Sequence, residues 1–332
     1  MKKLYAYFLI VMIALFTVAC TNKEDNEEVN IYPFTGIETT EDVSNRAIAV
    51  MVSNQVQARP QSGLTKADIV YEMLTEANIT RFLAIYQSTM PELVGPVRSA
   101  RDYFYTLADE LDAVYFYSGA ANFINDDMDA KDIERLEAAR YPADGNPFVR
   151  ETFRKAPHNL YVNFTNVYDA IEKKDYATEK SYEPYPFLEE YSEIEGEEAN
   201  YIKIDYYGSK PVVEYKYDEK TERYTRWNDA ETTIELESEI PVEMDNVFIV
   251  ETDHEVVDEE LRRDIDIHSG GKGYLFQKGK VQLVDWENRD GRILPVKDGE
   301  VLPFVPGQTW INFVETNPTS KVKAQVEYSN DN

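Results

Sequence analysis

The sequence predicts an α+β protein of two domains: an N-terminal α/β domain whose sheet is covered by helices, and a smaller, mostly β C-terminal domain. Short apolar runs alternate with helical patterns in the first half, and from residue 201 onward polar and apolar residues alternate with a period of two. Between them lies an acidic, proline-containing stretch at residues 179–198. A chain of 332 residues can bury two cores. We place the domains at residues 45–190 and 196–325.

The N-terminus has the three parts of a secretory signal over residues 1–19. Lys2 and Lys3 precede an apolar run that ends with the small residue Ala19, directly before Cys20. This run of about 15 residues is shorter than the roughly 20 that span a bilayer. Residues 17–20, TVAC, resemble the bacterial lipobox, whose cysteine is lipidated. We therefore expect an anchor of two acyl chains, such as palmitate, at Cys20.

The anchor places the protein on the extracytoplasmic face of the cell membrane, with a flexible acidic tether over residues 20–44. Cys20 is the one cysteine of the sequence. The exported part therefore has no internal disulfide, and its cores must hold without one.

Regular elements can be placed in order along the first domain. Buried strands are predicted at residues 46–53, 69–74, 80–86 and 113–117, although a helix is the alternative for residues 69–86 because Glu, Ala and Leu are frequent there. Helices are predicted at residues 100–111, 129–140 and 167–174, the first of them capped by Ser99.

The second domain shows the pattern of half-buried strands. They are predicted at residues 201–207, 212–217, 223–227, 247–250, 273–277, 280–286 and 308–313. Lys278-Gly279 and Asp298-Gly299 mark turns between such runs.

Composition limits the chemistry. The formal net charge of −28 repels nucleic acid and anionic lipid headgroups, so neither is expected as a general partner. Three histidines, no HExxH and no GxSxG give no signal for a metal or a nucleophile, and we expect no cofactor. Residues 125–129, NDDMD, begin like a calcium loop. Ala130 and Leu136 stand where such a loop needs Gly and Glu, so an acidic turn is predicted.

One group of basic residues is a candidate anion site. Arg98 and Arg101 flank a predicted helix start, where free N–H groups and the helix dipole favour an anion. Guanidinium groups bind phosphate or carboxylate through two hydrogen bonds. The alternative is that each arginine forms a structural salt bridge with one of the many carboxylates. The candidate ligand-binding residues are Arg59, Arg98, Arg101, Arg150, Arg154 and His158.

Several motifs resemble the YerB-like lipoproteins of Gram-positive bacteria, an uncharacterised family with an N-terminal and a smaller C-terminal domain. They are VSN at residues 52–54, RPQSGL at 59–64, ADIVYE at 67–72, GPVRSAR at 95–101, APHN at 156–159 and PGQTW at 306–310. The resemblance covers about residues 40–320. It implies two domains and a surface location, without a settled activity.

A weaker likeness, to the LytR–CpsA–Psr fold, rests on ADIVYE followed by a second strand and an Arg-x-x-Arg turn. Members of that family hold a polyprenyl pyrophosphate with arginines and Mg²⁺ and transfer glycopolymers to peptidoglycan. By this likeness Asp68 would lie near the metal, and Arg98 and Arg101 near phosphate. The family's Arg-Asp pair, expected directly after the second strand, is displaced here to Arg101-Asp102.

Together these features predict a cell-envelope lipoprotein that binds a cell-wall polymer, a phosphorylated ligand or an envelope protein without catalysis, or that regulates one. The alternative is an enzyme acting on phosphorylated, polyprenyl-pyrophosphate-linked wall intermediates. Solute capture for a transporter is a third option. An arginine face without a convergent acid or base would favour binding, and a deep pocket with carboxylates would favour the enzyme.

Overall fold

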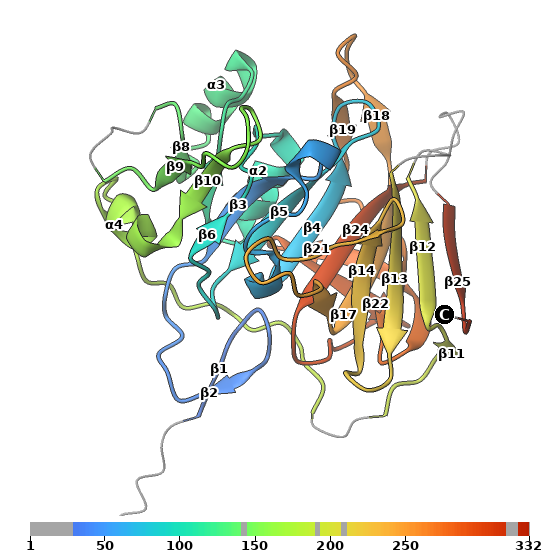
Figure 1. Ribbon diagram of the computed structural model, residues 1–332. Helices are drawn as coiled ribbons and strands as arrows, with labels where there is room; N and C mark the ends of the chain where they lie inside the picture. The colour runs from blue at the N-terminus through green and yellow to red at the C-terminus, as the bar shows by residue number, and fades with distance from the viewer. Residues whose placement is uncertain (1–28, 141–144, 190–192, 207–210, 317–324, 332) are drawn as a thin grey trace, which may run out of the picture.

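The computed structural model describes residues 29–140, 145–189, 193–206, 211–316 and 325–331, so the predicted signal and Cys20 lie outside the described residues (Figure 1). No helix in these ranges combines the length and hydrophobicity needed to cross a membrane. The described chain is mostly β, and its two parts are joined by one large sheet.

The large sheet contains, in spatial order, β23 (Glu300–Val301), β22 (Arg292–Lys297), β21 (Lys280–Arg289), β20 (Gly271–Gln277), β17 (Asn246–Thr252), β24 (Thr309–Glu315), β4 (Ile69–Leu74), β5 (Thr80–Tyr86), β3 (Ile48–Ser53), β7 (Val114–Tyr117) and β8 (Arg135–Glu137), with β11 (Glu197–Glu198) paired to β21. A second sheet contains β15 (Glu231–Thr232), β14 (Arg223–Asn228), β13 (Val212–Asp218), β12 (Tyr201–Asp205) and β25 (Gln325–Ser329), with β16 (Glu243–Met244) paired to β14.

Smaller elements complete the described chain. They are the sheet β6 (Leu93–Val94), β10 (Leu160–Asn163) and β9 (Phe148–Arg150), the pairs β1 (Asn30–Ile31) with β2 (Glu38–Thr39) and β18 (His254–Val256) with β19 (Arg263–Ile265), the helices α2 (Asp102–Glu110), α3 (Asn122–Ala130) and α4 (Val167–Glu172), and the 3₁₀ turns η1 (Val56–Ala58), η2 (Leu64–Lys66) and η3 (Phe164–Asn166).

Strand β24 joins the two parts of the molecule. It comes from the C-terminal part of the chain, yet it lies in parallel between β17 and the N-terminal strand β4. Its register pairs Trp310 with Val70 on one side and with Val247 on the other. All of its residues are buried, as expected for a central strand covered on both faces.

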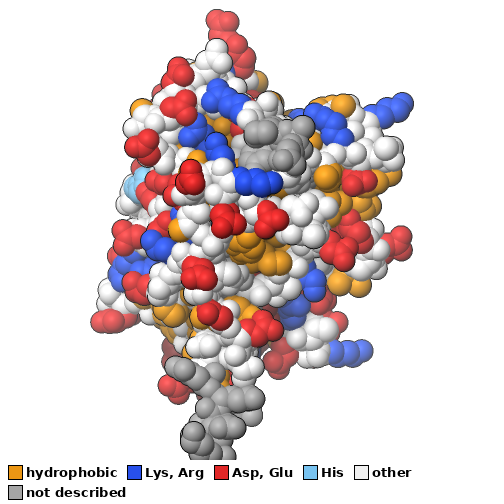
Figure 2. All heavy atoms as spheres, turned by 90° about the vertical axis from the view of Figure 1, so that its left-hand side faces the viewer, with side chains coloured by type: hydrophobic (Ala, Val, Ile, Leu, Met, Phe, Trp, Pro, Cys, Tyr) orange, Lys and Arg blue, Asp and Glu red, His pale blue; other side chains and the backbone are white. Residues whose placement is uncertain are grey.

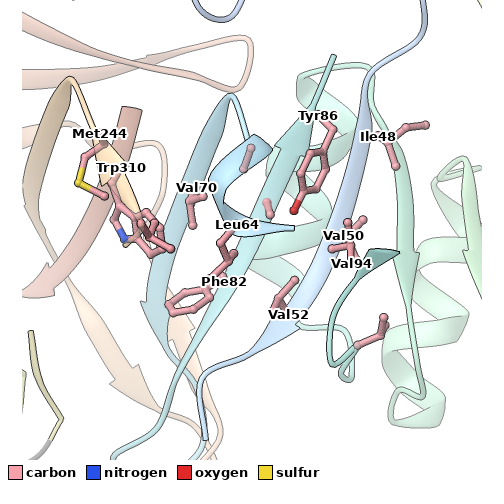
Figure 3. Close-up of a cluster of buried hydrophobic side chains, with 14 of the residues drawn as sticks. Ile48, Val50, Val52, Leu64, Val70, Phe82, Tyr86, Val94, Met244 and Trp310 are labelled. Atoms are coloured by element: carbon pink, nitrogen blue, oxygen red, sulfur yellow. The ribbon is translucent and has the colours of Figure 1, made fainter. Parts of the chain in front are cut away.

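The central strands separate two cores. Side chains alternate across the sheet, so Val50 and Phe82 face one core while Met51 and Leu83 face the other. The first core is closed by the second sheet, by the β6-β10-β9 sheet and by α4, and Figure 3 shows its centre, where Trp310 packs near Phe82 and Met244. The rings of Phe82 and Trp310 meet edge to face with centroids 5.1 Å apart.

The helix-covered α/β domain is only partly found. Helices α2 and α3 pack on the face of Met51 and Leu83, but strands of the second sheet cover much of the opposite face. The predicted helix at residues 129–140 is wrong: α3 ends at Ala130 and the edge strand β8 follows. The acidic turn predicted at residues 125–129 lies inside α3, where buried Asn125 accepts a hydrogen bond from Tyr117.

The predicted tether and the predicted linker, both expected to be flexible connections, instead pack against the folded part of the chain. In the predicted tether, β1 and β2 form a pair, and Phe34 between them is 2% exposed beside Tyr182 and Tyr185. Tyr185, from the predicted linker, is also buried and contacts Phe304. Aromatic burial holds both segments, which their acidic composition did not indicate. The domain boundary at residues 190–196 remains a prediction.

Candidate functional site

Three loops meet where β3 ends, and we call them the cationic loops. They are residues 54–63, 95–101 and 151–159. Ser62 and Gly95 exchange two backbone hydrogen bonds, of 2.9 and 3.2 Å. The amide of Val97 donates to the carbonyl of Leu160 at 2.7 Å, directly after the third loop. Each loop has one cis X-Pro peptide bond, before Pro60, Pro96 and Pro157. Sequence motifs far apart in the chain thus form one surface.

Arg98, Arg154 and His158 come together on the cationic loops. Arg98 donates to the side-chain oxygen of Gln55 at 2.7 Å, and Arg154 donates to the carbonyls of Ala58 and Pro60. Neither arginine forms an ion pair with a carboxylate in the part of the chain that the structure describes. Burial lowers the pKa of His158, and the nearby Arg98 and Arg154 lower it further. The group is therefore a cationic surface with a neutral imidazole beside it.

Of the other candidates, Arg59 forms an ion pair with Asp229 at 3.0 Å, which links the first cationic loop to the second sheet. Arg101 is buried and pairs with Glu76, which also binds Arg81 at 3.1 Å.

Arg150 is exposed and hydrogen-bonds the side chain of Asn159. The structure thus brings Arg98, Arg154 and His158 together. It gives Arg59 and Arg101 carboxylate partners instead, and Ser99 does not cap α2, whose N-cap is Arg101.

A hollow of about 330 Å³ opens beside the cationic loops. It is lined by Asn54, Gln55, Val56, Gln57, Arg59, Asn78, Ile79, Thr80, Pro211 and Asp229. A smaller hollow of about 170 Å³ lies against Arg59 and Asn54 on the side of Asn228 and Thr233. Arg59 lines both spaces, and its partner Asp229 lines the larger one, at the junction of the N-terminal part and the second sheet.

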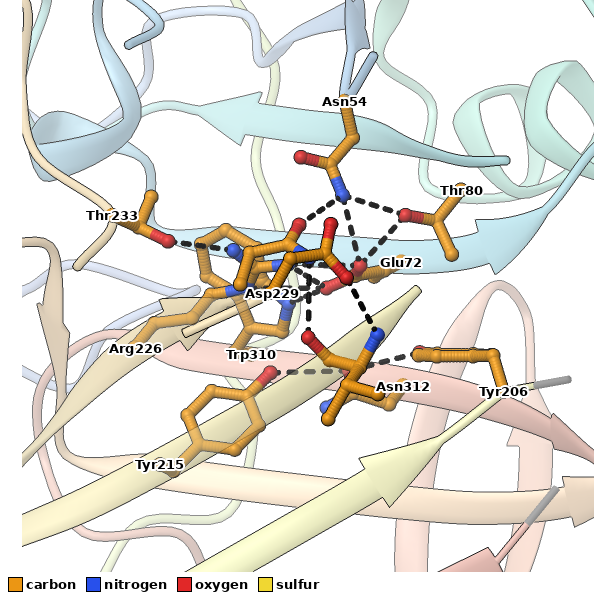
Figure 4. Close-up of polar contacts among 12 residues, drawn as sticks. Asn54, Glu72, Thr80, Tyr206, Tyr215, Arg226, Asp229, Thr233, Trp310 and Asn312 are labelled. Atoms are coloured by element: carbon orange, nitrogen blue, oxygen red, sulfur yellow. Dashed lines mark hydrogen bonds and ion pairs between the residues drawn. The ribbon is translucent and has the colours of Figure 1, made fainter. Parts of the chain in front are cut away.

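Beneath the hollows lies a buried ion pair that the sequence interpretation missed. Glu72 on β4 and Arg226 on β14 are both 0% exposed and 2.9 Å apart (Figure 4). Glu72 also accepts hydrogen bonds from Trp310 at 3.0 Å and Thr80 at 2.8 Å. Burial opposes the charge of Arg226, but the Glu72 carboxylate raises its pKa above the usual value. A buried charge pair of this kind needs such complete hydrogen bonding.

Further hydrogen bonds surround the buried pair on two sides, around Asn54 and around Asn312. Asn54 donates to Thr80 and to Asn228, both at 2.7 Å, and its side-chain oxygen accepts from Arg59 at 3.2 Å. On the other side, the hydroxyls of Tyr206 and Tyr215 donate to Asn312 on β24 at 3.0 Å (Figure 4). The Arg59–Asp229 pair, whose side chains are 15% and 10% exposed, is thereby connected to the fully buried pair through Asn54 and Asn228.

Asp68 does not join the arginines, contrary to what the LytR–CpsA–Psr likeness implied. It precedes β4 and accepts hydrogen bonds from the amides of Gln87 and Ser88 at 2.6 and 2.9 Å. Arg101 instead pairs with Glu76, which comes shortly after the last residue of β4, so the two arginines lie at the other end of this strand from Asp68. Burial raises the pKa of Asp68 to about 6. The residues therefore form no common site for Mg²⁺ and pyrophosphate.

Surface charge elsewhere is mainly negative. On the face shown in Figure 2, acidic side chains are spread from top to bottom, and basic groups lie among them at several heights. Among the described residues, no group of three or more His, Cys, Asp or Glu side chains is arranged to hold a metal ion. A cationic surface without carboxylate partners is therefore unusual on this molecule.

Comparisons with known proteins agree with this architecture. Residues 34–177 match the N-terminal domain of "Protein of unknown function (DUF3048)", and residues 202–311 match the C-terminal domain of the same family. The chain is 43% identical over 321 residues to "Putative lipoprotein YerB" of Bacillus subtilis (strain 168), covering 95% of this chain and 96% of that protein. A crystal structure of the YerB protein from Bacillus subtilis superposes with a TM-score of 0.81 at 42% identity, covering 90% of this chain and 99% of the other. The chain therefore belongs to the YerB-like family of two-domain proteins, defined by the N- and C-terminal domains of DUF3048.

Proposed function

We propose that this protein is a cell-envelope lipoprotein, anchored at Cys20 on the extracytoplasmic face of the membrane, that binds a phosphate-bearing cell-wall ligand without catalysis. The signal-like residues 1–19 and the lipobox-like TVAC support the anchor, as does the description of its Bacillus relative as a lipoprotein. Two acyl chains suffice for stable attachment to a membrane.

One observation carries the binding role. The sequence contains 62 acidic residues, yet Arg98 and Arg154 have no ion pair with any carboxylate in the described ranges. Arg98 is partly buried and makes one side-chain hydrogen bond, to Gln55. Its Nε is buried, so the terminal Nη groups are the ones that an incoming anion can reach, and phosphate oxygens accept such bonds strongly. In the described ranges no carboxylate forms an ion pair with either arginine, which supports binding over catalysis.

The anchor makes a first prediction. Cys20→Ala removes the thiol that lipidation requires, so the variant should appear in the medium or retain its signal, while the wild type stays with the membrane. Cell fractionation and the mass of the protein measure this outcome. A variant of mature mass that remains membrane-bound would show that the anchor lies elsewhere.

The cationic loops make a second prediction. Arg98→Ala should weaken the binding of inorganic pyrophosphate or phosphate about tenfold or more, because charge-assisted hydrogen bonds contribute about 1.5–3 kcal/mol. Its melting temperature should stay near that of the wild type, since only Gln55 loses a partner. Titration calorimetry and a melting curve measure both quantities.

Arg101→Ala is the matched control. Arg101 is buried and paired with Glu76, so its loss should lower the melting temperature and leave anion binding intact. The proposal fails if neither anion binds the wild type, or if Arg98→Ala binds both as the wild type does.

A further inference from the structure

We propose that the hollow lined by Asn54, Gln55, Gln57 and Asn78 is a sugar subsite, which holds a neutral sugar ring while the phosphate attached to it binds Arg98 and its neighbours. The inference rests on the anion site proposed above and names the ligand class: a sugar phosphate unit of a wall polymer or its precursor.

The lining chemistry suits a sugar ring. The side-chain amides of Gln57 and Asn78 are exposed and form no hydrogen bond in the described chain, and the amide nitrogen of Gln55 is also free. Amides both donate and accept, as sugar hydroxyls do. Val56, 64% exposed, and Ile79 supply apolar surface for the C–H face of a ring.

The charge of the hollow also favours a neutral group. Among the described residues that line it, the one guanidinium is that of Arg59, which is neutralised by Asp229 at 3.0 Å and held by the carbonyl of Asn54 at 2.9 Å. Such a pair presents a fixed donor and acceptor without net charge. The volume of about 330 Å³ lies at the lower end of the range for small-molecule pockets, roughly 300–1,000 Å³.

Gln55 makes the hollow continuous with the cationic surface. It lines the hollow and its side-chain oxygen accepts a hydrogen bond from Arg98 at 2.7 Å. A ligand whose ring contacts Gln55 therefore has its substituent beside Arg98. This arrangement joins a neutral subsite to an anionic one, which matches a phosphate ester on a sugar.

The test compares inorganic phosphate, N-acetylglucosamine, N-acetylglucosamine 1-phosphate and O-phosphoserine by calorimetry on the full mature chain. We expect the sugar phosphate to bind at least tenfold more tightly than inorganic phosphate or O-phosphoserine. Asn78→Ala and Gln57→Ala should each reduce sugar-phosphate binding about three- to tenfold and leave phosphate binding unchanged. Asn166→Ala, an exposed asparagine that makes no cap hydrogen bond at α4, is the control and should change neither.

The outcomes separate the two proposals. If phosphate binds through Arg98 but the sugar phosphate gains nothing, or O-phosphoserine binds equally well, the sugar subsite is refuted and the anion site stands. A gain that survives Asn78→Ala and Gln57→Ala also refutes the subsite. If neither phosphate nor the sugar phosphate binds, both proposals are overturned.

Discussion

Glu72→Gln should lower the free energy of unfolding by about 3–5 kcal/mol, because it leaves the charge of Arg226 buried without its counter-charge. Both side chains are 0% exposed, so water cannot replace the lost partner. The guanidinium of Arg226 also lies 4.9 Å from the ring centre of Trp310, in a site closed by aromatic surface. Urea denaturation measures the change.

The double variant Glu72→Gln with Arg226→Met distinguishes a charge effect from a packing effect. At this site it has no buried charge, and the glutamine oxygen can still accept from Trp310, so the double variant should be more stable than either single variant. Glu287→Gln is the surface control, because its partner Arg289 is 46% exposed, and it should cost less than about 1 kcal/mol. Additive losses in the double variant would contradict the coupling.

His254 should make the protein less stable as the pH falls below about 6.5. Its ring is 3% exposed, and neither ring nitrogen has a hydrogen-bond partner in the described ranges. Burial, and secondarily Arg263, lower the pKa of His254 to about 3. In the unfolded chain His254 therefore binds a proton near pH 6.5, whereas in the folded protein it stays neutral at that pH. Above pH 6.5 His254 does not reduce the free energy of unfolding. Below it, the free energy of unfolding falls by up to about 1.4 kcal/mol per pH unit.

The variant His254→Leu isolates this contribution from the titration of the carboxylates. Between pH 7 and pH 5, the wild type should lose about 2 kcal/mol more than the variant, since the two proteins differ in no other titrating group. Urea unfolding at both pH values gives the difference. Parallel losses in the two proteins would mean that His254 is protonated in the folded state.

The sequence predicted strands best where both faces are buried. β4 and β5 match the predicted ranges, and α2 and α4 lie within theirs, because hydrophobic periodicity and helix signals are local. β8 was predicted as helix because residues 129–140 contain helix formers, but its pairing with β7 is a tertiary contact. The position of β24 beside β4 joins residues more than 200 apart, which no local pattern encodes.

The site was predictable only in part. Arg98 was chosen for its place at a predicted helix start, and Arg154 and His158 by residue type, yet the sequence could not show which arginines would pair with carboxylates. Arg101 pairs with a carboxylate because Glu76, which follows the buried strand β4, lies at the same end of the sheet. Two signals for the buried pair were present. Glu72 interrupts an apolar run. Arg226 comes two residues after Tyr224, so both lie on the same, buried face of β14.

The central place of β24 also governs the order in which the molecule can fold. A chain synthesised from its N-terminus exposes an unpaired edge of β4 until Thr309–Glu315 has been made. Until then Glu72 lacks Trp310, and until β14 has emerged it lacks Arg226. The N-terminal part therefore stays incomplete during synthesis, and a product truncated before residue 309 is left with an unpaired, aggregation-prone sheet edge. The large sheet is complete only when the chain is present through Glu315.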